Sequence, residues 1–256
     1  MNAMIHLRAI WKRLIMVQGA TVFIRKRIDL HTAAELEHIV ISQAKAEHDL
    51  KSGGEWQCAR QVTLTEHSIS KAYLAPGGRF FLSLIRTAAV VYVDLDAPEV
   101  TWRELIPPCP SGLQDVTISF EHIIDAPTLT LHVAIAIERH LPTVYGVSRD
   151  EESTGEDSYT PSVQEVSIWR VNLQLDSQGI VCGLQANHLS QFRHSQKGVE
   201  PPRVDSIKLQ GNHLVLAQGY NPLHICSVIQ WAAADGLDVD IPRKVVSHES
   251  CHVCVP

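Results

Sequence analysis

The sequence lacks several features that would assign the chain to a class at once. No run of 18 apolar residues occurs anywhere, so we expect no transmembrane span. No Asn-x-Ser/Thr sequon is present, so nothing indicates a glycosylated, secreted surface. The net charge of 22 − 28 = −6, without a basic stripe in the larger part of the chain, disfavours a nucleic-acid partner.

Familiar catalytic motifs are also missing. The chain holds no G-x-S-x-G, no P-loop and no G-x-G-x-x-G, and no two acids stand out as a general acid and base. We therefore predict a chain that is not an enzyme and that binds no cofactor. Its 45% apolar and 20% charged residues are ordinary for a globular protein that buries a core.

The six cysteines show no disulfide pattern. They lie at positions 58, 109, 182, 226, 251 and 254, and most are far apart or beside strand-like runs. This usage predicts a reduced, intracellular protein of the cytoplasm or nucleus. Residues 4–17 are apolar but interrupted by Arg8, Lys12 and Arg13, and no cleavage site follows, so we expect no signal peptide.

Two helices are predicted near the N-terminus. In residues 4–17, four apolar residues recur at helical spacing, which favours an amphipathic helix that packs on its own domain. A basic helix that lies on a membrane surface is the alternative. In residues 32–50, Thr32 and Glu35 form a T-x-x-E capping box, and Gly53-Gly54 ends the helix.

After Trp56 the apolar period changes from 3.6 to 2, and short runs follow one another between Gly, Pro and Asn turns. This pattern predicts a mainly β protein, a sandwich or a propeller. The expected strands are Gln61–Leu64, Lys71–Ala75, Arg79–Leu84, Ala89–Asp94, Thr101–Ile106, Thr117–His122, Thr128–Ile137, Glu165–Leu175, Val181–Leu189, Ser206–Gln210, His213–Ala217 and His224–Trp231.

These strands group into about three units of a partial β-propeller. The clearest unit runs over residues 71–106, where Pro76-Gly77-Gly78 supplies the positive φ of a tight hairpin. Four antiparallel strands at this spacing make a propeller blade. A second unit spans about 115–192 and contains an acidic stretch at 149–158, which we expect to be a loop and a possible phosphorylation site. A third spans about 203–247 and looks truncated.

Two segments carry a resemblance to a family. Residues 74–106 (LAPGGRFFLSLIRTAAVVYVDLDAPEVTWRELI) resemble the first blade of WD-like propellers in fungal F-box proteins. Residues 10–36 (IWKRLIMVQGATVFIRKRIDLHTAAEL) resemble the last F-box helix and the linker helix after it, and residues 167–178 (SIWRVNLQLDSQ) resemble a later strand pair. The resemblance implies a substrate receptor in an SCF-type ubiquitin ligase, with an adaptor and a substrate protein as partners.

Departures from that family predict a truncated member. Only the last of about three F-box helices is present, and a closed propeller has at least four blades. The expected divisions are a remnant of the F-box region at 1–30, a linker helix at 31–55 and a partial propeller at 56–256. A non-functional gene fragment is a further alternative. The candidate partner-binding residues are Ile10, Trp11 and Leu14 on the first helix and the aromatics Trp102, Trp169, Tyr220 and Trp231.

One motif argues for chemistry instead. His248, Glu249 and His252 fit H-E-x-x-H, in which two histidines on one helical face bind zinc and the glutamate is the general base. A metal-dependent hydrolase is therefore the alternative function. The segment is rich in Val, Ser and Cys, which are poor helix formers, and no third ligand follows. Cys251 and Cys254 beside these histidines are half of a possible structural zinc site.

Overall fold

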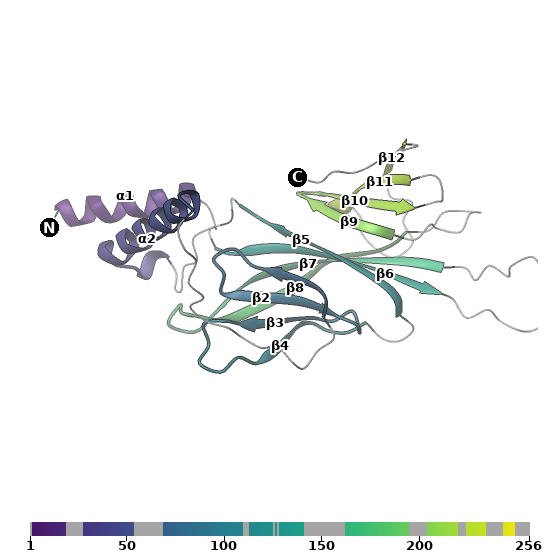
Figure 1. The fold of residues 1–256 in the computed structure, drawn as a ribbon, viewed down its shortest axis with the longest axis horizontal. Coiled ribbons are helices and arrows are strands. Elements are labelled where there is room, and N and C mark those ends of the chain that lie inside the picture. The colour runs from purple at the N-terminus through teal and green to yellow at the C-terminus, as the bar shows by residue number, and fades with distance from the viewer. Residues whose placement is uncertain are drawn as a thin grey trace, which may run out of the picture. The chain divides into compact units, whose positions relative to one another are not determined.

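The computed structural model describes residues 2–18, 28–53, 69–109, 113–124, 126, 128–140, 162–194, 204–219, 224–233 and 243–248. It contains two long helices and three four-stranded antiparallel sheets (Figure 1). In every sheet the strands lie side by side in chain order, as in a propeller blade. The predicted class is confirmed: the described residues are mainly β, with N-terminal helices and three antiparallel sheets that are consistent with a partial β-propeller.

The two helices form a hairpin. Helix α1 covers Asn2–Gln18, the short 3₁₀ helix η2 covers Ile28–Leu30, and helix α2 covers Ala33–Lys51. The predicted capping box is present, because the Thr32 hydroxyl accepts from Glu35 N while the Glu35 carboxylate accepts from Thr32 N at 2.7 Å. These bonds satisfy backbone groups that the first turn of a helix leaves unpaired. No described helix is long and apolar enough to cross a membrane.

The first sheet confirms the predicted blade. The turn before β2 has Gly77 and Gly78 at φ +84° and +73°, as its sequence requires. Alternate residues of β2 and β3 point to opposite faces, and both faces are buried from Val90 to Asp94. The strands are β1 (Ile69–Leu74), β2 (Phe80–Ile85), β3 (Val90–Asp94) and β4 (Trp102–Ile106).

The second and third sheets repeat the same meander with longer strands in the second. The second sheet holds β5 (Leu113–His122), β6 (Thr130–His140), β7 (Ser162–Leu175) and β8 (Val181–His194). The third holds β9 (Val204–Gln210), β10 (His213–Gly219), β11 (His224–Gln230) and β12 (Arg243–His248), with the 3₁₀ helix η3 (Trp231–Ala233) after β11.

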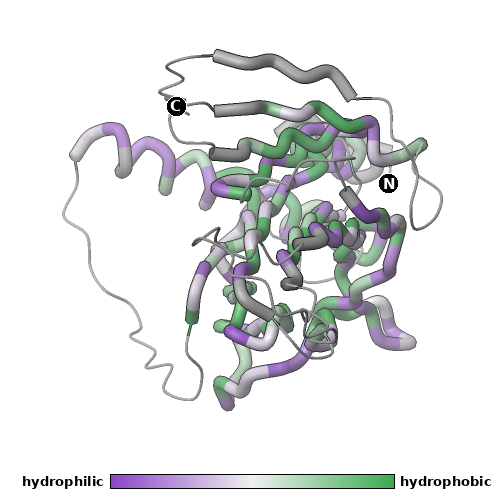
Figure 2. The backbone as a smooth tube through the Cα atoms, turned by 90° about the vertical axis from the view of Figure 1, so that its right-hand side faces the viewer, coloured by the Kyte–Doolittle hydropathy of each residue, from purple (hydrophilic) through white to green (hydrophobic). Residues whose placement is uncertain are grey.

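The chain divides into two compact units, and strands β7 and β8 contribute residues to both. The first unit comprises residues 1–107, 122–131 and 170–187, and the second comprises residues 108–121, 132–169 and 188–256. Apolar residues recur along the strands of the chain (Figure 2). The core of the second unit is an apolar cluster that includes Phe192, Leu214, Leu216 and Ile229, each at most 1% exposed.

The third sheet corrects one expectation. That unit was expected to be truncated, but it has four strands like the other two, because β12 pairs with β11 from His224↔His248 to Ile229↔Arg243. The predicted strand at 61–64, the acidic stretch at 149–158, Tyr220 and the tail from 249 onward lie outside the described residues.

Candidate protein-binding site

The helical hairpin is held by a small apolar core. Ile15, Leu36 and Val40 are buried between α1 and α2, and Trp11, Ile28 and Ile39 pack against them. Trp11 and Ile15 are four residues apart, so they lie on the same face of α1 and turn it towards α2.

Polar contacts tie α1 to the chain just before α2. The Arg8 guanidinium donates through Nε to the carbonyl oxygen of His31 at 3.0 Å and through a terminal nitrogen to that of Asp29 at 2.5 Å. Lys12 forms an ion pair with the Asp29 carboxylate. These contacts fix the rotation of α1 about its axis, because both side chains leave the helix on one side.

A second apolar row on α1 remains uncovered. Leu7, Ile10 and Leu14 are 49%, 54% and 39% exposed, and their spacing places them on one face of the helix. We call these three residues the α1 stripe. Because Trp11 and Ile15 already occupy the α2 side, the hairpin contact leaves the stripe facing outward. An exposed row of aliphatic side chains of this kind is typical of a docking surface.

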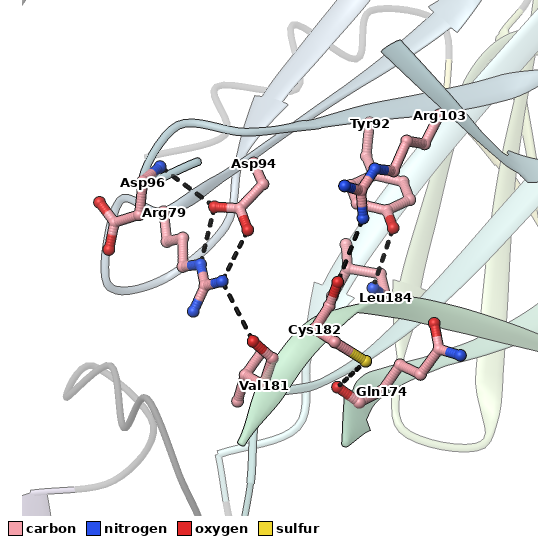
Figure 3. A network of polar contacts seen from close by, with 9 residues as sticks. All are labelled: Arg79, Tyr92, Asp94, Asp96, Arg103, Gln174, Val181, Cys182 and Leu184. Carbon is pink, nitrogen blue, oxygen red and sulfur yellow. Dashed lines mark hydrogen bonds and ion pairs between the residues drawn. The ribbon is translucent and has the colours of Figure 1, made fainter. Parts of the chain in front are cut away.

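A buried ion pair organises the turns of the first unit (Figure 3). Arg79 donates two parallel hydrogen bonds to Asp94, at 2.7 and 2.6 Å, and a third to the carbonyl oxygen of Val181 at 3.2 Å. Burial alone would raise the pKa of Asp94, but the hydrogen bonds and charge of Arg79 and the backbone N–H of Asp96 outweigh it and lower the pKa. The pair is structural: it joins the first sheet to the start of β8.

Two further contacts complete this join. The backbone N–H of Leu184 donates to the Tyr92 hydroxyl at 3.3 Å, and Arg103 donates to the carbonyl oxygen of Cys182 at 3.1 Å. Gly183 lies between them, and a Cβ on this glycine would be 2.6 Å from the Tyr92 oxygen. The close approach of these strands therefore requires glycine at this position.

A separate network supports the second unit. The Trp231 indole N–H donates to the carbonyl oxygen of Gly211 at 3.0 Å, and Gly211 N–H donates to the Glu121 carboxylate at 2.5 Å. The His132 ring meets Trp231 edge-on at 5.5 Å, and its Nδ1 lies 3.7 Å from a Glu121 oxygen. Trp231 is only 6% exposed, so its place here is in the core and not at a surface.

The other predicted aromatics do not form one site. Trp102 is half-buried against Phe81 in the first unit, with ring centroids 6.3 Å apart. Trp169 is in the second unit, where its indole donates to the Ser167 hydroxyl and its ring meets His188 at 4.8 Å. Of the predicted residues, the structure brings together Ile10 and Leu14, while Trp11 on the same helix packs towards α2.

Nothing described supports the alternative of a metal-dependent hydrolase. His248 is the last residue of strand β12, whereas the H-E-x-x-H arrangement needs a helix there. Among the described residues, no group of three His, Cys, Asp or Glu side chains could hold a metal ion. A shallow pocket beside Asp115, Thr117, Glu138 and Gln164 has room for about one water molecule, far less than a substrate needs.

Sequence reasoning missed one member of the stripe and all of the inter-sheet network. Leu7 was part of the amphipathic pattern of the first helix, and its spacing from Ile10 and Leu14 was the signal that could have added it. The contacts of Tyr92 and Arg79 join residues 92 and 102 positions apart, which no local pattern reveals. No family model, no curated protein and no solved structure matches this chain.

Proposed function

We propose that this chain is a protein-interaction scaffold that acts like the substrate-receptor subunit of an SCF-type ubiquitin ligase, in the cytoplasm or nucleus. The observation that carries the proposal is the α1 stripe: three exposed aliphatic side chains in a row, on a helix whose Trp11 and Ile15 are already engaged by α2. A rigid helix with an apolar row is a common way of binding a partner protein. In this proposal the stripe contacts the adaptor.

The three blades support the other half of the role. A propeller presents its turns as a rigid set of loops, and loops on a rigid scaffold commonly bind partners. Three exposed aliphatic residues, Ile124, Leu175 and Ile180, lie in or beside the β5–β6 and β7–β8 turns. The Arg79–Asp94 pair and the Tyr92 contact hold the β7–β8 turn against the first sheet, so this loop is ordered before a substrate binds.

Binding of a purified SCF adaptor by isothermal titration calorimetry tests the proposal. Ile10→Ser should weaken adaptor binding at least tenfold, because a central apolar anchor is worth more than about 1.4 kcal/mol. Ile41→Ser is the matched control, since Ile41 is also 54% exposed on a helix but belongs to α2 and lies outside the stripe. Absence of adaptor binding, or equal effects of the two variants, would overturn the proposal.

A further inference from the structure

The apolar face of α1 is wider than its contact with α2. At about 100° per residue, Leu7, Ile10 and Leu14 fall within an arc of roughly 60°, and Trp11 and Ile15 continue that arc towards α2. The contact with α2 therefore covers one edge of the apolar face. The α1 stripe, which forms the centre and the far edge of that face, stays exposed. An occupant of the stripe needs an apolar ridge about two helical turns long.

The charges on α1 limit which kinds of partner suit the α1 stripe. The helix carries Arg8, Lys12 and Arg13 and no acidic residue. Arg8 and Lys12 are engaged by the Asp29 and His31 backbone and the Asp29 carboxylate. Arg13 is exposed, makes no such contact among the described residues, and lies roughly 60° beyond Ile10 on the side away from α2. Arg13 thus places a cation at the open border of the stripe.

We infer that the α1 stripe binds a helix of a partner protein whose apolar ridge is bordered by carboxylates, one of which pairs with Arg13. This inference rests on the proposed function and names the chemistry of the partner that it requires. A carboxylate placed beside Arg13 adds a charge pair at the rim, which sets the orientation and the rate of association more than the affinity. The aliphatic ridge supplies the affinity.

The same features argue against an anionic membrane as the occupant. A helix that lies on a membrane inserts its aromatic residues at the interface and turns its cations to the headgroups. Here Trp11 packs towards α2, and two of the three cations are bound to η2 and the residues beside it. Three aliphatic residues and one available cation suit a helix of a protein better than a lipid surface.

Two synthetic helical peptides serve as probes, one with a leucine ridge bordered by glutamates and one with glutamine at the same positions. Fluorescence anisotropy with the full chain should show tighter binding of the glutamate peptide, and the difference should shrink when salt is raised to about 0.5 M. Arg13→Glu should reverse the preference, while Arg13→Gln should abolish it. Far-UV circular dichroism checks that both variants keep their helices.

The outcomes separate this inference from the proposed function. If the adaptor binds through Ile10 but neither Arg13 variant changes the preference between the peptides, the charge inference is wrong and the scaffold function stands. If the glutamate peptide binds as described but the adaptor does not, the surface chemistry stands and the ligase role falls. Binding to phosphatidylserine vesicles that is lost in both Ile10→Ser and Arg13→Glu would overturn the protein partner in favour of a membrane.

Discussion

Gly183 shows how closely the first sheet and the β7–β8 hairpin approach each other. Gly183→Ala should lower the free energy of unfolding by about 1–3 kcal/mol, because the new methyl group would overlap the Tyr92 hydroxyl. Urea denaturation measures the loss. Gly53→Ala is not a useful control, since its φ of +70° adds backbone strain.

The better control removes the obstructing oxygen. Tyr92→Phe alone should cost about 1–3 kcal/mol, because the buried Leu184 N–H loses its acceptor. In the double variant, Gly183→Ala should cost less than it does alone, since the clash is gone. Strictly additive losses would show that the alanine acts elsewhere.

Asp94 makes stability depend on pH. Its pKa is lower in the folded chain than in the unfolded one, so its contribution is complete above the ordinary carboxyl pKa of about 4 and is lost as the pH falls through the lowered value. Asp94→Asn should therefore flatten the fall in unfolding free energy between about pH 4 and pH 2. Glu99→Gln, at an exposed position, is the control for the loss of one carboxyl group. An equally steep fall in the unfolding free energy of Asp94→Asn at acid pH would contradict this assignment.

The sequence does not show which of the candidate aromatic residues are buried. Trp231 and Trp102 were equal candidates for a partner surface, yet one is buried in the second unit and the other is half-buried against Phe81. The alternation of apolar residues shows which face of a sheet a residue lies on, but not which other element packs against that face. Burial here depends on which sheet packs on which, and those contacts join residues far apart in sequence, such as Glu121 and Gly211.

At the scale of the element, the start of α2 is the most local feature of the fold. Thr32→Ala should destabilise the hairpin by about 1 kcal/mol, because Glu35 N loses its side-chain acceptor. The helical signal at 222 nm should decline at a lower temperature. Thr32→Ser retains the hydroxyl and should melt like the unaltered chain. Equal melting of all three would mean that the capping box contributes nothing.

The helices, turns and strands that could be predicted are those whose sequence patterns are local. The capping box, the Gly77-Gly78 turn and the twelve expected strands rest on short-range patterns, and the eleven of these strands that lie within the described residues are all present. Strand β12 was missed, since RKVVSH has only two adjacent apolar residues and no alternation. Its pairing with β11 defines it, and that pairing is not written in the segment itself.

The two units of the molecule share strands. Residues 162–169 of β7 belong to the second unit and residues 170–175 to the first, and β8 divides in the same way between residues 187 and 188. Unfolding of one unit would break the backbone ladder that continues into the other. We therefore expect the β-rich part of the chain to unfold as one cooperative body.

Variants in the two units test that expectation. Trp231→Phe, in the second unit, removes the indole donor to Gly211 and should cost about 1–2 kcal/mol, which lowers the melting temperature by roughly 2–8 °C. Gly183→Ala, in the first unit, should shift the same transition by a comparable amount. Differential scanning calorimetry should show one β-sheet transition in each variant, at the temperature where tryptophan fluorescence changes. Two resolved transitions, each moved by only one variant, would show that the shared strands do not couple the units.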